Sequence, residues 1–220
     1  MGSEIKKRII TSILLIGLLI AMYFYSYIMI ISLIIIAMIT WIEFYGIISK
    51  IFTKKSYKHI FYRFIFKSIS LFYLFFLVFF LFSIESYYLN FKIYVLYSIL
   101  VAIMSDIGGL VFGKTFKGLK LTKISPNKTI SGSIGSFIFS LSLIPLFIEK
   151  LVVHNYLTLI LITITISLAT QVGDLLISYL KRKAQVKNTS NILPGHGGFL
   201  DRIDGIILAI PIGALLFYYF

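Results

Sequence analysis

The sequence predicts an all-α integral membrane protein, a polytopic bundle of about seven transmembrane helices joined by short loops. Hydrophobic residues make up 59% of the 220 residues, and the mean hydropathy is +0.99. They occur in continuous runs, and a run of about 17 to 25 apolar residues is long enough to cross a bilayer as a helix. The sequence contains no cysteine, which excludes disulfides, thiolate metal sites and cysteine nucleophiles.

The predicted spans, in chain order, cover residues 9–25, 28–48, 68–84, 91–113, 133–149, 156–180 and 203–220. The first run follows a basic segment, as a signal peptide does. However, aromatic residues 23–25 stand where a cleavage site needs small residues, so we expect this run to remain as a span. Glu43 ends the second run beside Phe44, close to the expected membrane interface. Its role as a structural or a catalytic carboxylate stays open.

The basic residues predict the orientation of these spans. All of them except Lys92 and Lys150 fall in the N-terminal segment and in the second, fourth and sixth loops. The positive-inside rule therefore places the N-terminus and these loops in the cytoplasm, and seven spans place the C-terminus outside. The second loop, residues 50–67, is basic and aromatic, which favours contact with anionic lipid headgroups. We expect no nucleic-acid partner, because no recognisable binding fold surrounds these charges.

Two polar stretches interrupt the apolar sequence. In the first, Asp106 shares a helix face with Gly109 and Gly113, which would place a carboxylate beside a close approach of a phosphate or of a packed helix. The second runs from Gln171 to Asp204 and begins with a polar stripe at three- and four-residue steps, formed by Gln171, Asp174, Ser178, Lys181 and Arg182.

The second stretch ends in a glycine-rich turn and a pair of acids. The turn, Gly195-His196-Gly197-Gly198, would leave main-chain N–H groups accessible to phosphate oxygens. His196 could contact a phosphate or donate a proton. Asp201 and Asp204 are three residues apart and are expected on one face at the start of the last span, where the helix dipole favours negative charge.

Both stretches resemble the CDP-diacylglycerol synthase (phosphatidate cytidylyltransferase) family. The family pattern S-x-x-K-R, four residues, K-D, then P-G-H-G-G-x-x-D-R-x-D is matched by Ser178, Lys181, Arg182, Lys187, Pro194, Gly195, His196, Gly197, Gly198, Asp201, Arg202 and Asp204. An upstream pattern is matched by Asp106, Gly113, Lys114, Ser125, Pro126, Lys128, Thr129 and Gly132. Three positions depart from the family: Leu110 replaces an aromatic residue, Ser131 a glutamate and Asn188 an acid.

The resemblance implies a nucleotidyltransferase of phospholipid biosynthesis that moves CMP from CTP to phosphatidate, giving CDP-diacylglycerol and pyrophosphate. It implies catalytic roles for Asp174, Lys181, Arg182, His196 and Asp201. It also implies substrate contacts from Asp106, Lys114, Ser125, Lys128, Thr129, Ser178, Lys187, Gly195, Gly197, Gly198, Arg202 and Asp204. Asp174 and Asp201 would hold Mg²⁺, and we expect them to be metal ligands rather than structural partners of Lys181 or Arg202. A second cation and a homodimer stay open.

We interpret residues 1–220 as a single membrane domain, with hydrophobic spans in 1–100 and the catalytic helices and cytoplasmic motif loops in 101–220. A bacterial inner membrane is the expected location, with membrane lipids as surroundings and partners. Two alternatives remain: a CTP-dependent polyprenol or phytol kinase, which would transfer the γ-phosphoryl group, and a transporter. The transporter is disfavoured because the charges cluster at helix ends rather than at matched midplane positions of two repeats.

Overall fold

The computed structural model describes residues 2–87, 92–122, 125, 128–151, 153, 155–195 and 197–220. Across these ranges the regular structure is helical, and β pairing is limited to two isolated bridges, Lys120–Thr129 and Leu193–Gly197. Five candidate spans are long and apolar enough to cross a membrane: Ser26–Ile51, Tyr57–Ser83, Lys92–Phe116, Ile130–Phe147 and Tyr156–Lys183. The predicted first and last spans are also helical but shorter. These findings confirm a polytopic helical membrane protein.

The chain divides into two compact units. The N-terminal unit combines Met1–Leu89 with Leu180–Arg202, and the C-terminal unit combines Asn90–Tyr179 with Ile203–Phe220. The segment Leu180–Arg202 lies near the end of the sequence, but it belongs to the same unit as the N-terminal helices.

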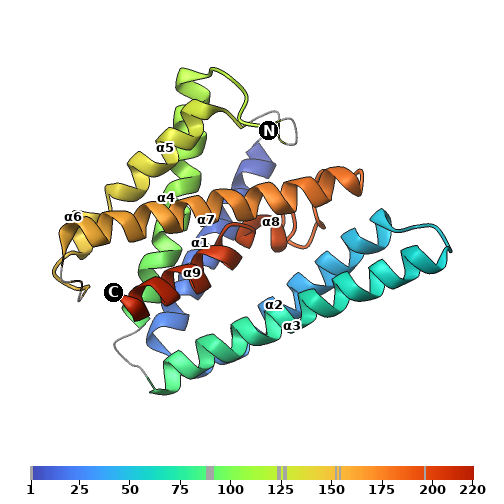
Figure 1. The fold of residues 1–220 in the computed structure, drawn as a ribbon, viewed down its shortest axis with the longest axis horizontal. Coiled ribbons are helices and arrows are strands. Elements are labelled where there is room, and N and C mark those ends of the chain that lie inside the picture. Colours follow the sequence, from blue (N-terminus) through green and yellow to red (C-terminus); the bar gives the residue numbers. More distant parts are fainter. Residues whose placement is uncertain are drawn as a thin grey trace. The chain divides into compact units, whose positions relative to one another are not determined.

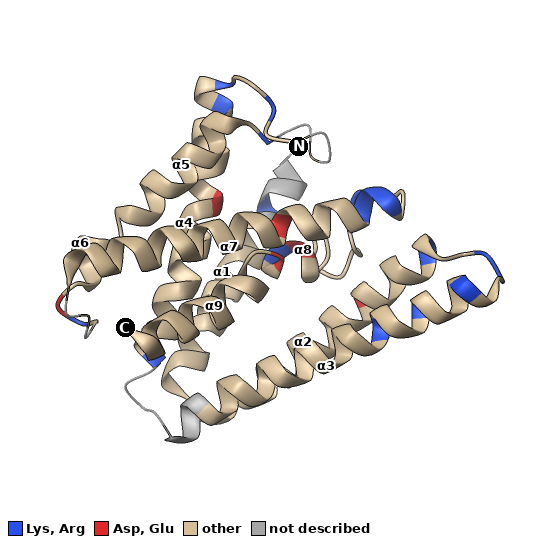
Figure 2. Ribbon diagram, in the orientation of Figure 1, with Lys and Arg blue, Asp and Glu red and all other residues tan. Residues whose placement is uncertain are grey.

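The N-terminal unit contains α1 (Gly2–Phe24), α2 (Ser26–Ile51) and α3 (Tyr57–Tyr87). Helices α2 and α3 lie side by side as a hairpin (Figure 1). Trp41 on α2 donates its indole N–H to the Lys67 carbonyl over 3.3 Å, and the Lys67 ammonium lies 3.0 Å from the centre of the Tyr45 ring. Basic residues gather at the α2–α3 turn, while the helices leading into it are mostly uncharged (Figure 2). This is the distribution that the charge pattern predicted for a loop at the membrane surface.

The C-terminal unit contains α4 (Lys92–Phe116), α5 (Ile130–Leu141), α6 (Ile144–Phe147), most of α7 (Tyr156–Lys183) and α9 (Ile206–Tyr219). Its core gathers large apolar side chains such as Tyr97, Ile166 and Phe217. Hydroxyl pairs also join its helices, with Ser105 3.0 Å from Ser167. Small and hydroxyl-bearing residues let helices approach closely where apolar burial gives little driving force in lipid.

The glycines of α4 serve this packing. A Cβ on Gly109 would lie 2.8 Å from the Ser136 hydroxyl, and one on Gly113 would lie 3.2 Å from the Thr129 hydroxyl. Both neighbours belong to α5 or to its N-terminal cap. Of the two interpretations left open for these glycines, the structure shows close helix packing.

The last predicted span begins differently from the expectation. Asp201 lies in the one-turn helix α8 (Leu200–Ile203), whereas Asp204 is buried in the turn before α9. The Asp204 carboxylate accepts the N–H of Gly205 over 3.0 Å. Such a local side-chain bond competes with helical hydrogen bonding, so the two acids do not share the first turn of one continuous helix.

Candidate active site

Of the two predicted catalytic aspartates, Asp201 accepts more hydrogen bonds than Asp174 does. Its Oδ1 atom accepts a hydrogen bond from the Lys181 ammonium over 2.6 Å. Its Oδ2 atom accepts the N–H of Thr189 at 2.9 Å, the N–H of Gly198 at 3.0 Å and the Thr189 hydroxyl at 3.1 Å. The Asp201 side chain is only 6% exposed and that of Lys181 14%. The carboxylate is therefore held at the centre of a closed set of donors.

These donors also set the ionisation of Asp201. Burial of the carboxylate by itself would raise its pKa, but the hydrogen bonds from Lys181 and from the N–H groups of Thr189 and Gly198 act in the opposite direction. They outweigh the burial and hold the pKa of Asp201 below its ordinary value. Asp201 therefore stays ionised at neutral pH, as a ligand for a cation or a partner for Lys181 must.

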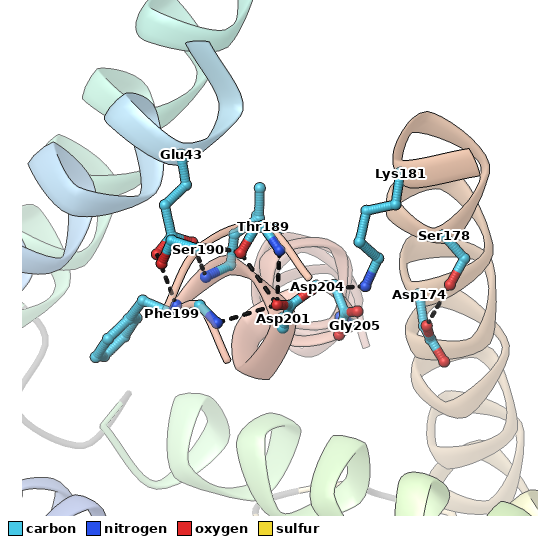
Figure 3. Close-up of polar contacts among 12 residues, drawn as sticks. Glu43, Asp174, Ser178, Lys181, Thr189, Ser190, Phe199, Asp201, Asp204 and Gly205 are labelled. Atoms are coloured by element: carbon cyan, nitrogen blue, oxygen red, sulfur yellow. Dashed lines mark hydrogen bonds and ion pairs between the residues drawn. The ribbon is translucent and has the colours of Figure 1, made fainter. Parts of the chain in front are cut away.

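Glu43 forms a second carboxylate centre in the same unit (Figure 3). This side chain of α2 is 4% exposed. Its Oε1 atom accepts the Ser190 hydroxyl at 2.6 Å and the Phe199 N–H at 2.9 Å. Its Oε2 atom accepts the Thr189 hydroxyl at 2.8 Å and the Leu200 N–H at 2.8 Å. Sequence reasoning left the role of Glu43 open, although a lone acid in an apolar run was the signal that could have identified it.

The glycine-rich turn is closed by its own backbone. Leu193 and Gly197 exchange two main-chain hydrogen bonds, and Gly195 and Gly197 have φ values of +76° and +86°, which favour glycine. The N–H of Gly197 goes to Leu193 and that of Gly198 to Asp201. In this structure both N–H groups donate to other groups of the protein rather than being open to a phosphate, which differs from the expectation. His196 lies outside the described residues.

Asp174 belongs to a separate polar cluster in the C-terminal unit. Its Oδ1 atom accepts the Ser178 hydroxyl at 3.2 Å, and its Oδ2 atom pairs with the Lys128 ammonium. The side chains of Asp174 and Lys128 are 27% and 25% exposed. Gln171, one turn earlier, accepts the Ser133 hydroxyl over 2.6 Å. The predicted polar stripe on α7 thus finds partners inside the protein, as a polar face in an apolar span requires.

Most of the other predicted site residues occupy helix ends and loops, whereas Asp106 lies within α4. Thr129 caps α5 by accepting the Gly132 N–H at 3.1 Å, and the Ser125 N–H donates to the Thr122 hydroxyl at 3.2 Å. The remaining charged side chains are exposed, namely Asp106, Lys114, Arg182, Lys187 and Arg202. Within the described residues, no group of three or more acidic or histidine side chains forms a ready-made metal site. Asp201 forms an ion pair with Lys181, and its role as a metal ligand stays a prediction.

Comparison with known proteins places the chain in a family. A model of the cytidylyltransferase family matches residues 2–220. The chain belongs to that family. It is similar to proteins named phosphatidate cytidylyltransferase: 47% identical over 115 residues to the one from Rickettsia bellii (strain RML369-C), covering 49% of this chain and 50% of the relative. The relative from Staphylococcus epidermidis (strain ATCC 12228) is 42% identical over 118 residues, covering 52% and 45%.

A third relative, from Rickettsia felis, is 47% identical over 115 residues, covering 49% of this chain and 51% of the relative. The chain spans about half the length of the curated relatives it matches. The family model thus matches nearly the whole chain, whereas each of the named relatives is similar to about half of it.

Proposed function

We propose that this protein transfers CMP from CTP to phosphatidate, giving CDP-diacylglycerol and pyrophosphate. The observation that carries the proposal is the buried Asp201–Lys181 pair, which joins the S-x-x-K-R and D-R-x-D segments of a cytidylyltransferase-family chain. The relatives named above bear the name of this activity. Membership of the family, the motif residues and the ionised carboxylate all support the same reaction class.

The reaction needs charge cancellation more than proton removal. A phosphate oxygen of phosphatidate forms a bond to the α-phosphorus of CTP, and the bond from that phosphorus to the α,β-bridging oxygen breaks. Pyrophosphate leaves with the electron pair of that bond. The attacking phosphate is already largely ionised near neutral pH, so repulsion between two anions is the main barrier. Ammonium groups such as those of Lys181 and Lys128 are suited to reduce that repulsion and to stabilise the leaving pyrophosphate.

We further propose that Asp174 and Asp201 hold Mg²⁺. Their carboxylate oxygens are the hard ligands that Mg²⁺ prefers, and Mg²⁺ is commonly held by one or two carboxylates together with substrate phosphates. When bound, the ion would supply Lewis-acid neutralisation of phosphate charge. Lys128 pairs with Asp174 and Lys181 with Asp201, and the Lys181 contact helps to keep Asp201 in its charged form.

A cytoplasmic site follows from the charge pattern. We propose that the N-terminus, the α2–α3 turn and the loop after α7 face the cytoplasm of a bacterium, with the protein in its inner membrane, because the basic residues gather there. The chain has no cysteine, so single cysteines give labelling without background. Lys55→Cys should react with an impermeant maleimide only from the cytoplasmic side and Phe220→Cys only from the outside. Labelling of both from one side would contradict this topology.

The reaction is tested with the purified full chain in detergent, supplied with CTP labelled at the α-phosphorus, phosphatidate and Mg²⁺. We expect label in a lipid product that matches CDP-diacylglycerol, with one pyrophosphate released per product. CTP labelled at the γ-phosphorus is the control. Transfer of the γ-label to a polyprenol or phytol would instead identify the kinase alternative. Absence of a labelled lipid product with any of the three acceptors would contradict the proposed activity.

A further inference from the structure

We propose that Glu43 is a positioning residue that holds the catalytic Asp201 segment in place from an N-terminal helix. Here the motif loop means residues 184–199, between α7 and α8. The proposal rests on the function proposed above and adds a residue that lies 146 positions from Thr189 in the motif loop. Glu43 is on α2, and the contacts that carry the inference lie within the N-terminal unit.

The first argument is the completeness of the Glu43 contacts. Each carboxylate oxygen accepts one hydroxyl and one main-chain N–H, at distances of 2.6 to 2.9 Å. A buried carboxylate is costly unless such bonds replace its lost water, so the side chain and the loop depend on each other. A carboxylate that merely reached the membrane interface would be hydrated instead of fully bonded to a distant loop.

The second argument is that Glu43 and Asp201 accept hydrogen bonds from the same two segments of the chain, at Thr189 and at residues 198–200. Asp201 accepts the N–H groups of Thr189 and Gly198, and Glu43 accepts the next N–H groups, those of Phe199 and Leu200. The Thr189 hydroxyl lies 2.8 Å from a Glu43 oxygen and 3.1 Å from an Asp201 oxygen. One hydroxyl hydrogen serves one acceptor at a time, so the two carboxylates share this donor. Displacement of Glu43 therefore disturbs the donors of Asp201 directly.

The third argument concerns the chemistry that position 43 requires. Glutamine would keep the volume but replace one acceptor oxygen by an NH₂ donor. Each Glu43 oxygen accepts a main-chain N–H, from Phe199 or from Leu200. In either orientation of a glutamine amide, its NH₂ group would therefore face one of these N–H donors and could not accept a hydrogen bond from it. Aspartate keeps the charge and both acceptors but is one methylene shorter. The structure thus predicts that Asp replaces Glu43 better than Gln does, although Gln is closer in size.

The main experiment compares Glu43→Gln and Glu43→Asp with the wild-type protein. Glu149→Gln is the matched control, because Glu149 is exposed and carries the same substitution outside the motif. Turnover with CTP and phosphatidate is measured together with KM for each substrate. We expect Glu43→Gln to lower kcat by about 10- to 100-fold, as loss of a supporting partner typically does, and Glu43→Asp to recover part of it. Glu149→Gln should match wild type. A folded Glu43→Gln protein with kcat within about threefold of wild type would overturn the proposal.

A second readout does not depend on activity. Trypsin can cut after the exposed Lys187 in the motif loop and after Lys54 or Lys55 in the α2–α3 turn. We expect Glu43→Gln to speed cleavage at Lys187 relative to the turn, because a loosened loop opens more often. Equal relative cleavage in Glu43→Gln and wild type would count against the proposal. If the wild-type protein made no CDP-diacylglycerol, the proposed function would fail, and this ratio would still decide whether Glu43 holds the loop.

A further variant keeps the proposal testable if Glu43→Gln does not fold. The double variant Thr189→Val with Ser190→Ala removes both hydroxyl donors of Glu43 and leaves the acid itself in place. Thr189→Ser, which keeps its hydroxyl, is the control. We expect the double variant to lose turnover and to be cut faster at Lys187, and Thr189→Ser to keep more turnover and to be cut more slowly than the double variant. A double variant that equals wild type in both readouts would refute the proposal.

Discussion

Gly198→Ala tests the packing between the motif loop and Glu43. A methyl group on Gly198 would lie 2.7 and 2.9 Å from the two Glu43 carboxylate oxygens and would overlap the Thr189 hydroxyl. Both neighbours are held by several hydrogen bonds, so neither can move without losing some of them. Overpacking costs about 1 to 3 kcal/mol, and a hydrogen bond to a charged group contributes about 1.5 to 3 kcal/mol. We therefore expect a loss of about 2 to 4 kcal/mol of stability.

The assay is thermal unfolding of purified protein in detergent, with Gly46→Ala as the matched control. Gly46 lies in α2, and a methyl group there meets no atom within 4 Å. Alanine in a helix interior is more favourable than glycine by about 0.5 to 1 kcal/mol, so the control should unfold at the wild-type temperature or slightly above it. Gly198→Ala should lower the midpoint by about 4 °C or more, since 1 kcal/mol corresponds to about 2 to 4 °C at this size.

A double-variant cycle assigns the effect to Glu43. Glu43→Asp shortens the acid and should make room for the Gly198 methyl group, so Glu43→Asp should cost less stability in the Gly198→Ala background than in the wild type. Unchanged midpoints for Gly198→Ala, or strictly additive effects in the cycle, would refute the close packing of Gly198 against Glu43.

The remaining predictions concern the acids and Asn188. Asp174→Asn should lower Mg²⁺-dependent turnover with little change in the unfolding midpoint, because this acid is a quarter exposed. Asp201→Asn should lower both, because it leaves the buried Lys181 unpaired; an active and equally stable Asp201→Asn protein would contradict this. The folded-state pKa of Asp201 lies below its unfolded value, so its stabilisation is present above about pH 4 and is lost as the pH falls further. Unfolding midpoints in EDTA between pH 3 and 6 should show this slope, and Asp201→Asn should flatten it. The Asn188 side chain lies 3.3 Å from where a Cβ of Gly197 would stand, which supports a loop-ordering role. Asn188→Asp should thus change the Mg²⁺ needed for half-maximal rate by less than tenfold, or about 1.4 kcal/mol, and a larger shift would indicate a charged contact in the metal site.

The sequence by itself determined the class of the protein and where to look for its site. Hydropathy runs are local, so they predict helices wherever a span is long enough, and the structure has helices in all seven predicted places. Motif spacing is also local, and the family resemblance that rests on it predicts Asp174, Lys181 and Asp201 as site residues. Spacing did not predict that Asp201 lies in α8 and Asp204 in the turn before α9. That turn includes a hydrogen bond from the Gly205 N–H to the Asp204 side chain, which hydropathy does not reveal.

Only the tertiary structure decided which polar groups meet. Glu43 and Thr189 are 146 positions apart, and no periodicity in either segment shows that α2 receives the motif loop. The same holds for the pairing of Lys128 with Asp174 and of Lys181 with Asp201, because each joins segments whose approach depends on the packing of the chain. The physical reason is that a buried carboxylate must find donors somewhere, but the chain alone does not say where. The sequence therefore predicts that Glu43 needs partners, and the fold supplies them from the loop that holds Asp201.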